Sequence, residues 1–107
     1  MDAIKNDVIQ LIDKELTAAN SKFPMFSSPH EGYAVMLEEY DETEDELKLC
    51  RNMFSLLWED VKSNNYKGQA NKAANIREYA MRTAVEAIQL SAMAQKFIDS
   101  YTQQEAL

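Results

Sequence analysis

The stretch between Gly32 and Gly68 contains neither glycine nor proline, and this absence constrains the fold more than any other feature. Its apolar residues, with Thr43 as the one polar member, recur at spacings of three and four, the period of a buried helical stripe. They are Tyr33, Met36, Tyr40, Leu47, Cys50, Phe54, Leu57 and Val61. The pattern predicts one unbroken helix over residues 29–62, on the order of 50 Å long. One small domain cannot cover such a stripe, so the sequence predicts a partner subunit or a kink near residues 38–46.

The start of this helix carries its own signal. Ser28 stands at the N-cap position, Pro29 at the first helical position and Glu31 at the third. This arrangement is a capping box with the proline that helix starts favour.

The rest of the chain also shows helical spacing. Apolar residues predict a helix over residues 2–19 and another, rich in alanine, over residues 71–101. Residues 22–27 form a linker whose two phenylalanines we expect beneath the bundle or against a ligand, residues 63–69 form a loop, and residues 102–107 form a frayed tail. We therefore expect one all-α domain over residues 1–107, with two long antiparallel helices plus an N-terminal helix, completed as a homodimer or homotetramer.

Composition excludes several classes. Glycine and proline number two each, and 46% of the residues are hydrophobic, so the chain is not disordered. A pI near 4.6 argues against direct binding to nucleic acid. The sequence has no long apolar run or signal pattern, and its single cysteine, Cys50, has no internal partner; we expect a cytoplasmic protein without a membrane segment.

The acidity of the chain is local. Seven of the nine residues from Glu38 to Glu46 are carboxylates, which equals the whole net charge of −7. The remainder is neutral, with 11 basic and 11 acidic residues. Clustered carboxylates repel each other and resist burial, so such a block beside apolar residues indicates a cation or a basic partner.

Helical geometry places some of these carboxylates on one face. Glu39, Glu42 and Glu46 fall within about 60° of one another, and the first and last border the apolar stripe. In the later helix, Glu86 borders the stripe beside Ala87. If the two long helices pack antiparallel, Glu86 reaches the level of Glu39 and Glu42, an arrangement with which helical bundles build Mg²⁺ sites.

Two segments carry a family resemblance. The string FPMFSSPHEGYAVMLEEYDE, residues 23–42, and the string EAIQLSAMA, residues 86–94, resemble segments of small MazG-like proteins of phages and bacteria. The resemblance spans residues 23–99 and implies an all-α nucleoside triphosphate pyrophosphohydrolase that uses Mg²⁺ to release pyrophosphate from an NTP or dNTP. The family pairs Glu-x-x-Glu on one helix with Glu-x-x-Asp on the next; here Gln89 stands at the aspartate position.

The resemblance also implies roles. Glu39, Glu42 and Glu86 would hold Mg²⁺, with Gln89 offering a neutral oxygen ligand. Either Glu38 or Glu46 would be the base for the attacking water. The residues expected to contact substrate are His30 and Tyr33 near the helix start, and the basic residues Lys48, Arg51, Arg82 or Lys96 for phosphate.

A second class of function competes with this one. A non-catalytic acidic helical protein, such as a phage-encoded inhibitor, would use the same carboxylates to bind a basic protein partner. Carboxylates spread over an outer surface would favour the inhibitor, whereas Glu86 within a few ångströms of Glu39 or Glu42 would favour the enzyme. The substitution at Gln89 is also compatible with lost catalysis and retained binding.

Overall fold

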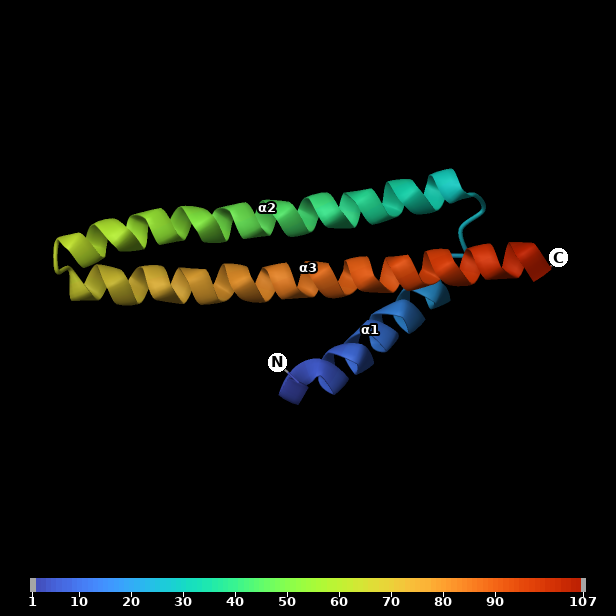
Figure 1. The fold of residues 1–107 in the computed structure, drawn as a ribbon, viewed down its shortest axis with the longest axis horizontal. Coiled ribbons are helices and arrows are strands. Elements are labelled where there is room, and N and C mark those ends of the chain that lie inside the picture. Colours follow the sequence, from blue (N-terminus) through green and yellow to red (C-terminus); the bar gives the residue numbers. More distant parts are fainter. Residues whose placement is uncertain (1, 107) are drawn as a thin grey trace. The chain divides into compact units, whose positions relative to one another are not determined.

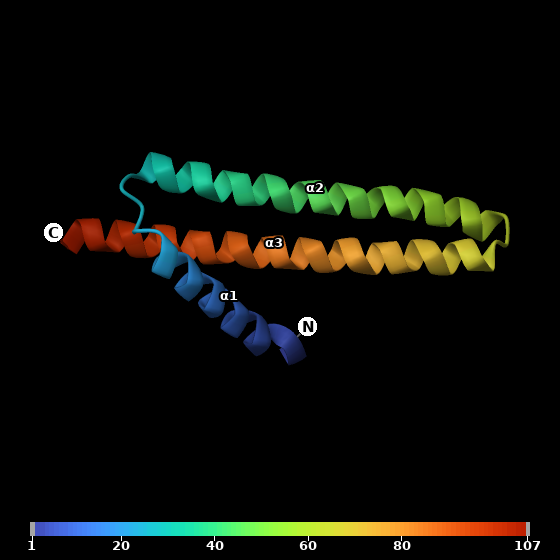
Figure 2. The same ribbon diagram turned by 180° about the vertical axis from the view of Figure 1, so that it is seen from behind.

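Three α-helices make up the described part of the chain (Figure 1; Figure 2 gives the view from behind). The computed structural model describes the backbone of residues 2–106 and the side chains of residues 2–101. Helix α1 spans Asp2–Lys22, α2 spans Pro29–Lys62 and α3 spans Tyr66–Ala106. These residues include no strand, which confirms the all-α class, and none of their helices has the length and apolar character needed to cross a membrane.

The start of α2 lies where the sequence predicts it. The backbone N–H of Glu31 donates to Ser28 Oγ at 3.1 Å, which confirms the cap. In a capping box the Glu31 carboxylate would accept from the backbone N–H of Ser28. Here it accepts instead from the backbone N–H and the hydroxyl of Ser27, one residue earlier.

Two helix bounds and one loop differ from the prediction. Helix α1 continues to Lys22, beyond the expected end at residue 19. Helix α3 begins at Tyr66, five residues early, because Asn65 caps it: Asn65 Oδ1 accepts from the backbone N–H of Gly68 at 3.0 Å. The expected loop over residues 63–69 therefore shrinks to three residues, with Asn64 in the left-handed region at φ 57°. The backbone of the expected frayed tail is helical as far as Ala106.

The chain forms two compact units. The first, here the three-helix unit, comprises Met1–Tyr40 and Glu86–Leu107 and so contains α1, the start of α2 and the end of α3. The second, here the hairpin unit, comprises Asp41–Val85.

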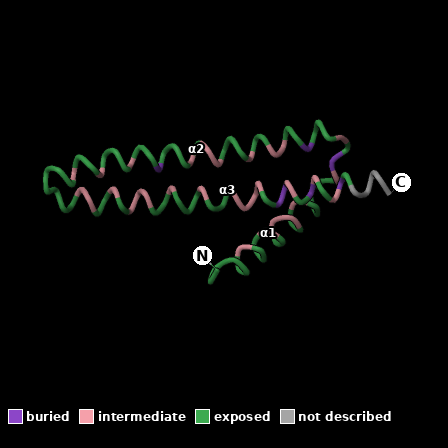
Figure 3. Tube along the Cα trace, viewed as in Figure 1, coloured by how far each residue is buried: buried purple, intermediate pink, exposed green. Residues whose placement is uncertain are grey.

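The core lies in the three-helix unit, on α3 and the linker (Figure 3). Phe26, Ala92 and Met93 are buried there, and half-buried side chains from all three helices surround them: Ile12, Leu16, Ala19, Val35, Met36 and Phe97. The backbone N–H of Phe26 donates to the buried Ser100 Oγ at 3.0 Å, which fixes the linker against α3. The expectation that the linker phenylalanines lie beneath the bundle is confirmed for Phe26, whereas Phe23 remains exposed.

The hairpin unit is an antiparallel pair of helix segments with little buried surface. Cys50 is its one buried residue, with Sγ 3.9 Å from the carbonyl oxygen of Ile76. The turn is held by Asp60, whose carboxylate accepts from Lys72 Nζ at 3.1 Å and from Asn65 Nδ2 at 3.4 Å.

The predicted apolar stripe of α2 is only partly buried. Cys50 is buried, and Met36 and Leu57 are half-buried, as expected. The members that recur every seven residues are exposed instead: Tyr33, Tyr40, Leu47, Phe54 and Val61. The residues that directly precede these exposed members, such as Gly32 and Glu39, are less exposed, and they include small and polar side chains. A Cβ at the buried Gly32, for example, would overlap the Phe97 ring. The apolar pattern alone could not identify this face, because a close helix approach here selects small size over hydrophobicity.

Candidate metal centre and adjoining hollow

Glu39 on α2 and Glu86 on α3 lie close together in the three-helix unit, and Gln89 is hydrogen-bonded to both. Each of the three side chains is half-buried. With its nitrogen turned toward the carboxylates, the Gln89 amide donates to Glu39 Oε2 at 3.2 Å and to Glu86 Oε2 at 2.9 Å. Glu86 and Gln89 are three residues apart on α3, so both project from the same face of that helix.

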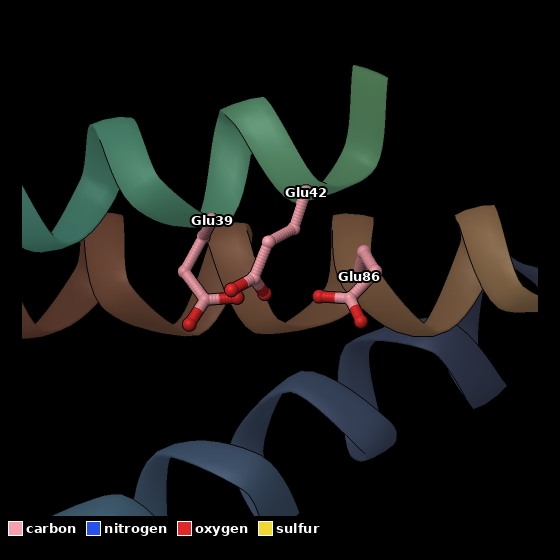
Figure 4. Close-up of side chains that lie close together, drawn as sticks. All are labelled: Glu39, Glu42 and Glu86. Atoms are coloured by element: carbon pink, nitrogen blue, oxygen red, sulfur yellow. The ribbon is translucent and has the colours of Figure 1, made fainter. Parts of the chain in front are cut away.

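Glu42 completes the carboxylate cluster, defined here as Glu39, Glu42 and Glu86 (Figure 4). It follows Glu39 by one turn of α2 and is the exposed member. One oxygen from each carboxylate lies within 4.8 Å of the other two. The sequence predicted these three residues as a set, and the structure brings them together.

The donor set fits a hard divalent cation. Mg²⁺ takes oxygen ligands at about 2.0–2.1 Å in an octahedron, which places neighbouring ligand oxygens about 2.9 Å apart and opposite ones about 4 Å apart. Small side-chain movements would bring the three carboxylate oxygens to that spacing. The cluster contains no histidine or cysteine, so its chemistry suits Mg²⁺ far better than zinc.

The amide of Gln89 gives this cluster a particular character. Its two N–H groups satisfy carboxylate oxygens and hold Glu39 and Glu86 together without a further negative charge. Rotation of the same amide by half a turn presents an oxygen ligand in place of the two donors. An aspartate at this position would add charge and metal affinity but would repel the two glutamates when no cation is present.

The two predicted bases differ in their surroundings. Glu38 is exposed on α2 and lies outside the carboxylate cluster. Glu46 is half-buried, and its Oε2 is buried without a hydrogen-bond partner among the described residues. A buried carboxylate oxygen without a donor costs free energy unless a cation or a water proton meets it. Glu46 belongs to the hairpin unit and, like Glu38, is not a member of the carboxylate cluster.

A hollow of about 460 Å³ adjoins Glu39 and Gln89 within the three-helix unit. Its volume falls in the range of about 300–1,000 Å³ typical of small-molecule sites. The apolar part of its wall comes mainly from the linker, with residues of all three helices, and it includes Ala18, Ala19, Phe23, Pro24, Phe26, Val35 and Met93. Its polar groups are Glu15, Lys22, Glu31, Glu39, Gln89 and Lys96. A ligand in the hollow would contact the apolar wall together with Glu39 and Gln89.

Lys96 differs most from its expected setting. The sequence places it on a helix flank, yet it is 2% exposed and forms part of the wall of the hollow. Its Nζ lies 5.1 Å from the centre of the Phe26 ring, a cation–π contact. The α1 residues Glu15 and Lys22 also line the hollow and were not predicted, since a charged residue on an amphipathic helix gives no signal that it faces a cavity.

The other expected substrate-binding residues lie away from the hollow. His30 and Tyr33 are exposed at the start of α2, where they line a shallow depression with Pro29 and Phe97. The residues that line the hollow include neither of them.

Three basic residues predicted to contact phosphate belong to the hairpin unit. Lys48 Nζ lies 2.9 Å from Glu44 Oε1, and this hydrogen bond, with the attraction of the Glu44 charge, raises the pKa of Lys48 above its ordinary value. Arg51 is exposed in a groove of that unit with Lys48. Arg82 pairs with Glu78 at 3.2 Å. The residues that line the hollow of the three-helix unit include none of them.

The carboxylate cluster, whose donor set suits a divalent cation, adjoins a partly aromatic hollow whose wall contains the cationic Lys96. Such a combination can bind a phosphorylated aromatic ligand and activate water against its phosphorus. No protein-family model, curated protein or solved structure matches this chain.

Proposed function

We propose that this protein is an Mg²⁺-dependent nucleoside triphosphate pyrophosphohydrolase. The observation that carries the proposal is the convergence of Glu39, Glu42 and Glu86, with one oxygen of each within 4.8 Å of the others. Carboxylates from two helices in one cluster are the arrangement expected for an enzyme, whereas an acidic inhibitor would expose them all. The resemblance of residues 23–42 and 86–94 to MazG-like proteins supports the same reaction.

The hollow supports a nucleotide as the substrate class. Its volume of about 460 Å³ suits a nucleoside, and the Phe23 and Phe26 rings offer faces for a base. Because Glu39 and Gln89 line the hollow and also contribute to the metal centre, the triphosphate of a bound nucleotide would meet the carboxylates.

The chain's own residues have separable roles in the reaction. Glu39, Glu42 and Glu86 would hold the metal, and Gln89 would orient two of them through its amide. Bound Mg²⁺ supplies neutralisation of phosphate charge and a lowered pKa for a coordinated water. Attack of the water oxygen on the α-phosphorus breaks the bond to the α–β bridging oxygen, which leaves with pyrophosphate. A carboxylate takes the proton of the water, and the two candidates for this base are Glu38 and Glu46.

Pyrophosphate release from a panel of NTPs and dNTPs, measured with and without Mg²⁺, tests the proposal. We expect release with at least one nucleotide and its loss by more than about 100-fold in Glu39→Gln, because even outer-shell partners of metals contribute about 10–100-fold. Asp41→Asn is the matched control, since it removes one charge from the same acidic segment at an exposed position outside the cluster. Absence of release from every nucleotide, or equal release by Glu39→Gln, would refute the enzyme and favour a protein that binds a basic partner.

A further inference from the structure

Lys96 contributes a positive charge to the wall of the hollow and has no charged partner among the described residues. The residue is 2% exposed, yet its Nζ has no ion-pair or hydrogen-bond partner among the described residues. Burial of the side chain removes part of the water around the ammonium, and the cation–π contact with Phe26 offsets only part of that cost. A charge left in this state on the wall of a hollow indicates an anionic ligand.

The surrounding structure holds Lys96 in place. Ser100, one turn later on α3, donates its hydroxyl to the Lys96 carbonyl oxygen at 2.8 Å and accepts from the backbone N–H of Phe26 at 3.0 Å. The linker and α3 are thus joined next to Lys96, with the Phe26 ring beside its ammonium. The Phe26 ring beside the ammonium is thus fixed before any ligand arrives, and this preorganisation lowers the entropy cost of binding.

The charges of the hollow define the anion. Three glutamates and two lysines line it, so an isolated anion meets repulsion as well as attraction: Glu15, Glu31, Glu39, Lys22 and Lys96. An anion that also binds a cation at Glu39 meets attraction at both ends. A phosphate group fulfils both requirements, because its oxygens accept from an ammonium and coordinate Mg²⁺.

We propose that Lys96 is the phosphate-recognition residue of the hollow, its ammonium binding a phosphate oxygen of the ligand whose metal-bound end lies at Glu39. This assignment rests on the proposed function for its substrate class. Phosphate recognition by Lys96 can nevertheless be measured separately from hydrolysis.

Calorimetric titration with inorganic pyrophosphate tests the assignment, with one series in EDTA and one in Mg²⁺. We expect the wild type to bind in the millimolar range in EDTA and at least tenfold more tightly in Mg²⁺. We expect Lys96→Met to weaken binding by at least tenfold in both series, Lys96→Arg to retain most of it, and Lys67→Met to leave it unchanged. Lys67 is the matched control because it is an exposed lysine of the hairpin unit. Acetate at equal concentration should not compete.

Thermal unfolding gives an independent readout. Replacing an unpaired buried ammonium by an apolar side chain of similar length should raise the Tm of Lys96→Met by about 5 °C without ligand. A lysine with only a structural role would give the opposite sign. In the wild type, amide NMR shifts of Lys96 and Phe26 should move with pyrophosphate, a measurement that does not depend on the folding of any variant.

Three results would overturn the assignment: no pyrophosphate binding by the wild type, equal binding by Lys96→Met, or equal competition by acetate. Failure of the proposed function looks different. If the metal centre is wrong, Mg²⁺ does not tighten binding but the dependence on Lys96 remains. If only Lys96 is wrong, the effect of Mg²⁺ remains and the variants bind alike.

Discussion

The amide nitrogen of Gln89 lies 2.9 Å from Glu86 Oε2, so a neutral donor meets the carboxylate in a cluster that otherwise contains like charges. The same nitrogen lies 3.2 Å from Glu39 Oε2. One side chain thus links two helices and stabilises a carboxylate pair that would repel each other without a cation.

Gln89→Asp should therefore have opposite effects on metal affinity and on stability without metal. We expect Mg²⁺ to bind about tenfold more tightly, because a charged ligand replaces an amide, and the metal-free protein to lose about 1–2 kcal/mol of unfolding free energy. Calorimetry with Mg²⁺ and urea unfolding in EDTA measure the two effects. Ser91→Asp adds a charge to the same helix at an exposed position and should produce neither. Unchanged Mg²⁺ affinity in Gln89→Asp would show that this position does not face the metal.

Asp60 should matter more for stability than any surface ion pair. Its carboxylate lies 3.1 Å from Lys72 Nζ, and both side chains are mostly buried, at 16% and 23% exposure. Asp60→Asn should lower the unfolding free energy by about 1–3 kcal/mol, because Lys72 loses its charge partner and the turn loses an anchor. In Glu59→Gln, which breaks the exposed pair with Lys62, the loss should stay below about 0.5 kcal/mol. Urea unfolding that ranks the two variants equally would contradict the structure of the turn.

Gly32→Ala tests the close approach of α2 to Phe97. Helix propensity alone would make alanine more stable by about 1 kcal/mol. The added Cβ would overlap the Phe97 ring and crowd Phe26, so we expect a net loss of about 1–3 kcal/mol in unfolding free energy. A gain in Tm would mean that α2 and the end of α3 are further apart than the structure places them.

The exposed heptad residues of α2 predict self-association. Tyr33, Tyr40, Leu47, Phe54 and Val61 recur every seven residues on one exposed face, the period of a coiled-coil seam. Light scattering at micromolar concentration should give the mass of a homodimer or homotetramer, and Phe54→Lys should shift it toward the monomer. Ile4→Lys changes an equally exposed apolar residue outside the seam and should leave the mass unchanged. A monomeric wild type would contradict this prediction.

The residues differ in how far the sequence reveals their positions. Ser28 and Pro29 determine the start of α2 locally, so a capping pattern predicts it correctly. Asn65 caps α3 in the same way, but the prediction placed it inside a loop because polar residues surround it. Glu39 and Glu86 could be paired from sequence because helical period and chain reversal bring them to one level.

Properties that depend on packing between helices could not be predicted as well from the sequence. Lys96 has the sequence surroundings of a surface lysine, and only the meeting of the linker with α3 buries it. Which face of α2 packs inward also depends on the partner helix, since Gly32 and Glu39 lie on the less exposed side while Phe54 does not. The hydrophobic period cannot predict these features, because the packed face of α2 includes small and polar residues.

Calorimetric titration of Mg²⁺ into the wild type, Glu86→Gln and Asp41→Asn tests the central claim most directly. The account predicts that the wild type and Asp41→Asn bind Mg²⁺ with the same affinity, while Glu86→Gln binds at least about tenfold more weakly with unchanged helical circular dichroism. Equal Mg²⁺ affinity in all three proteins would contradict the metal centre at Glu39, Glu42 and Glu86.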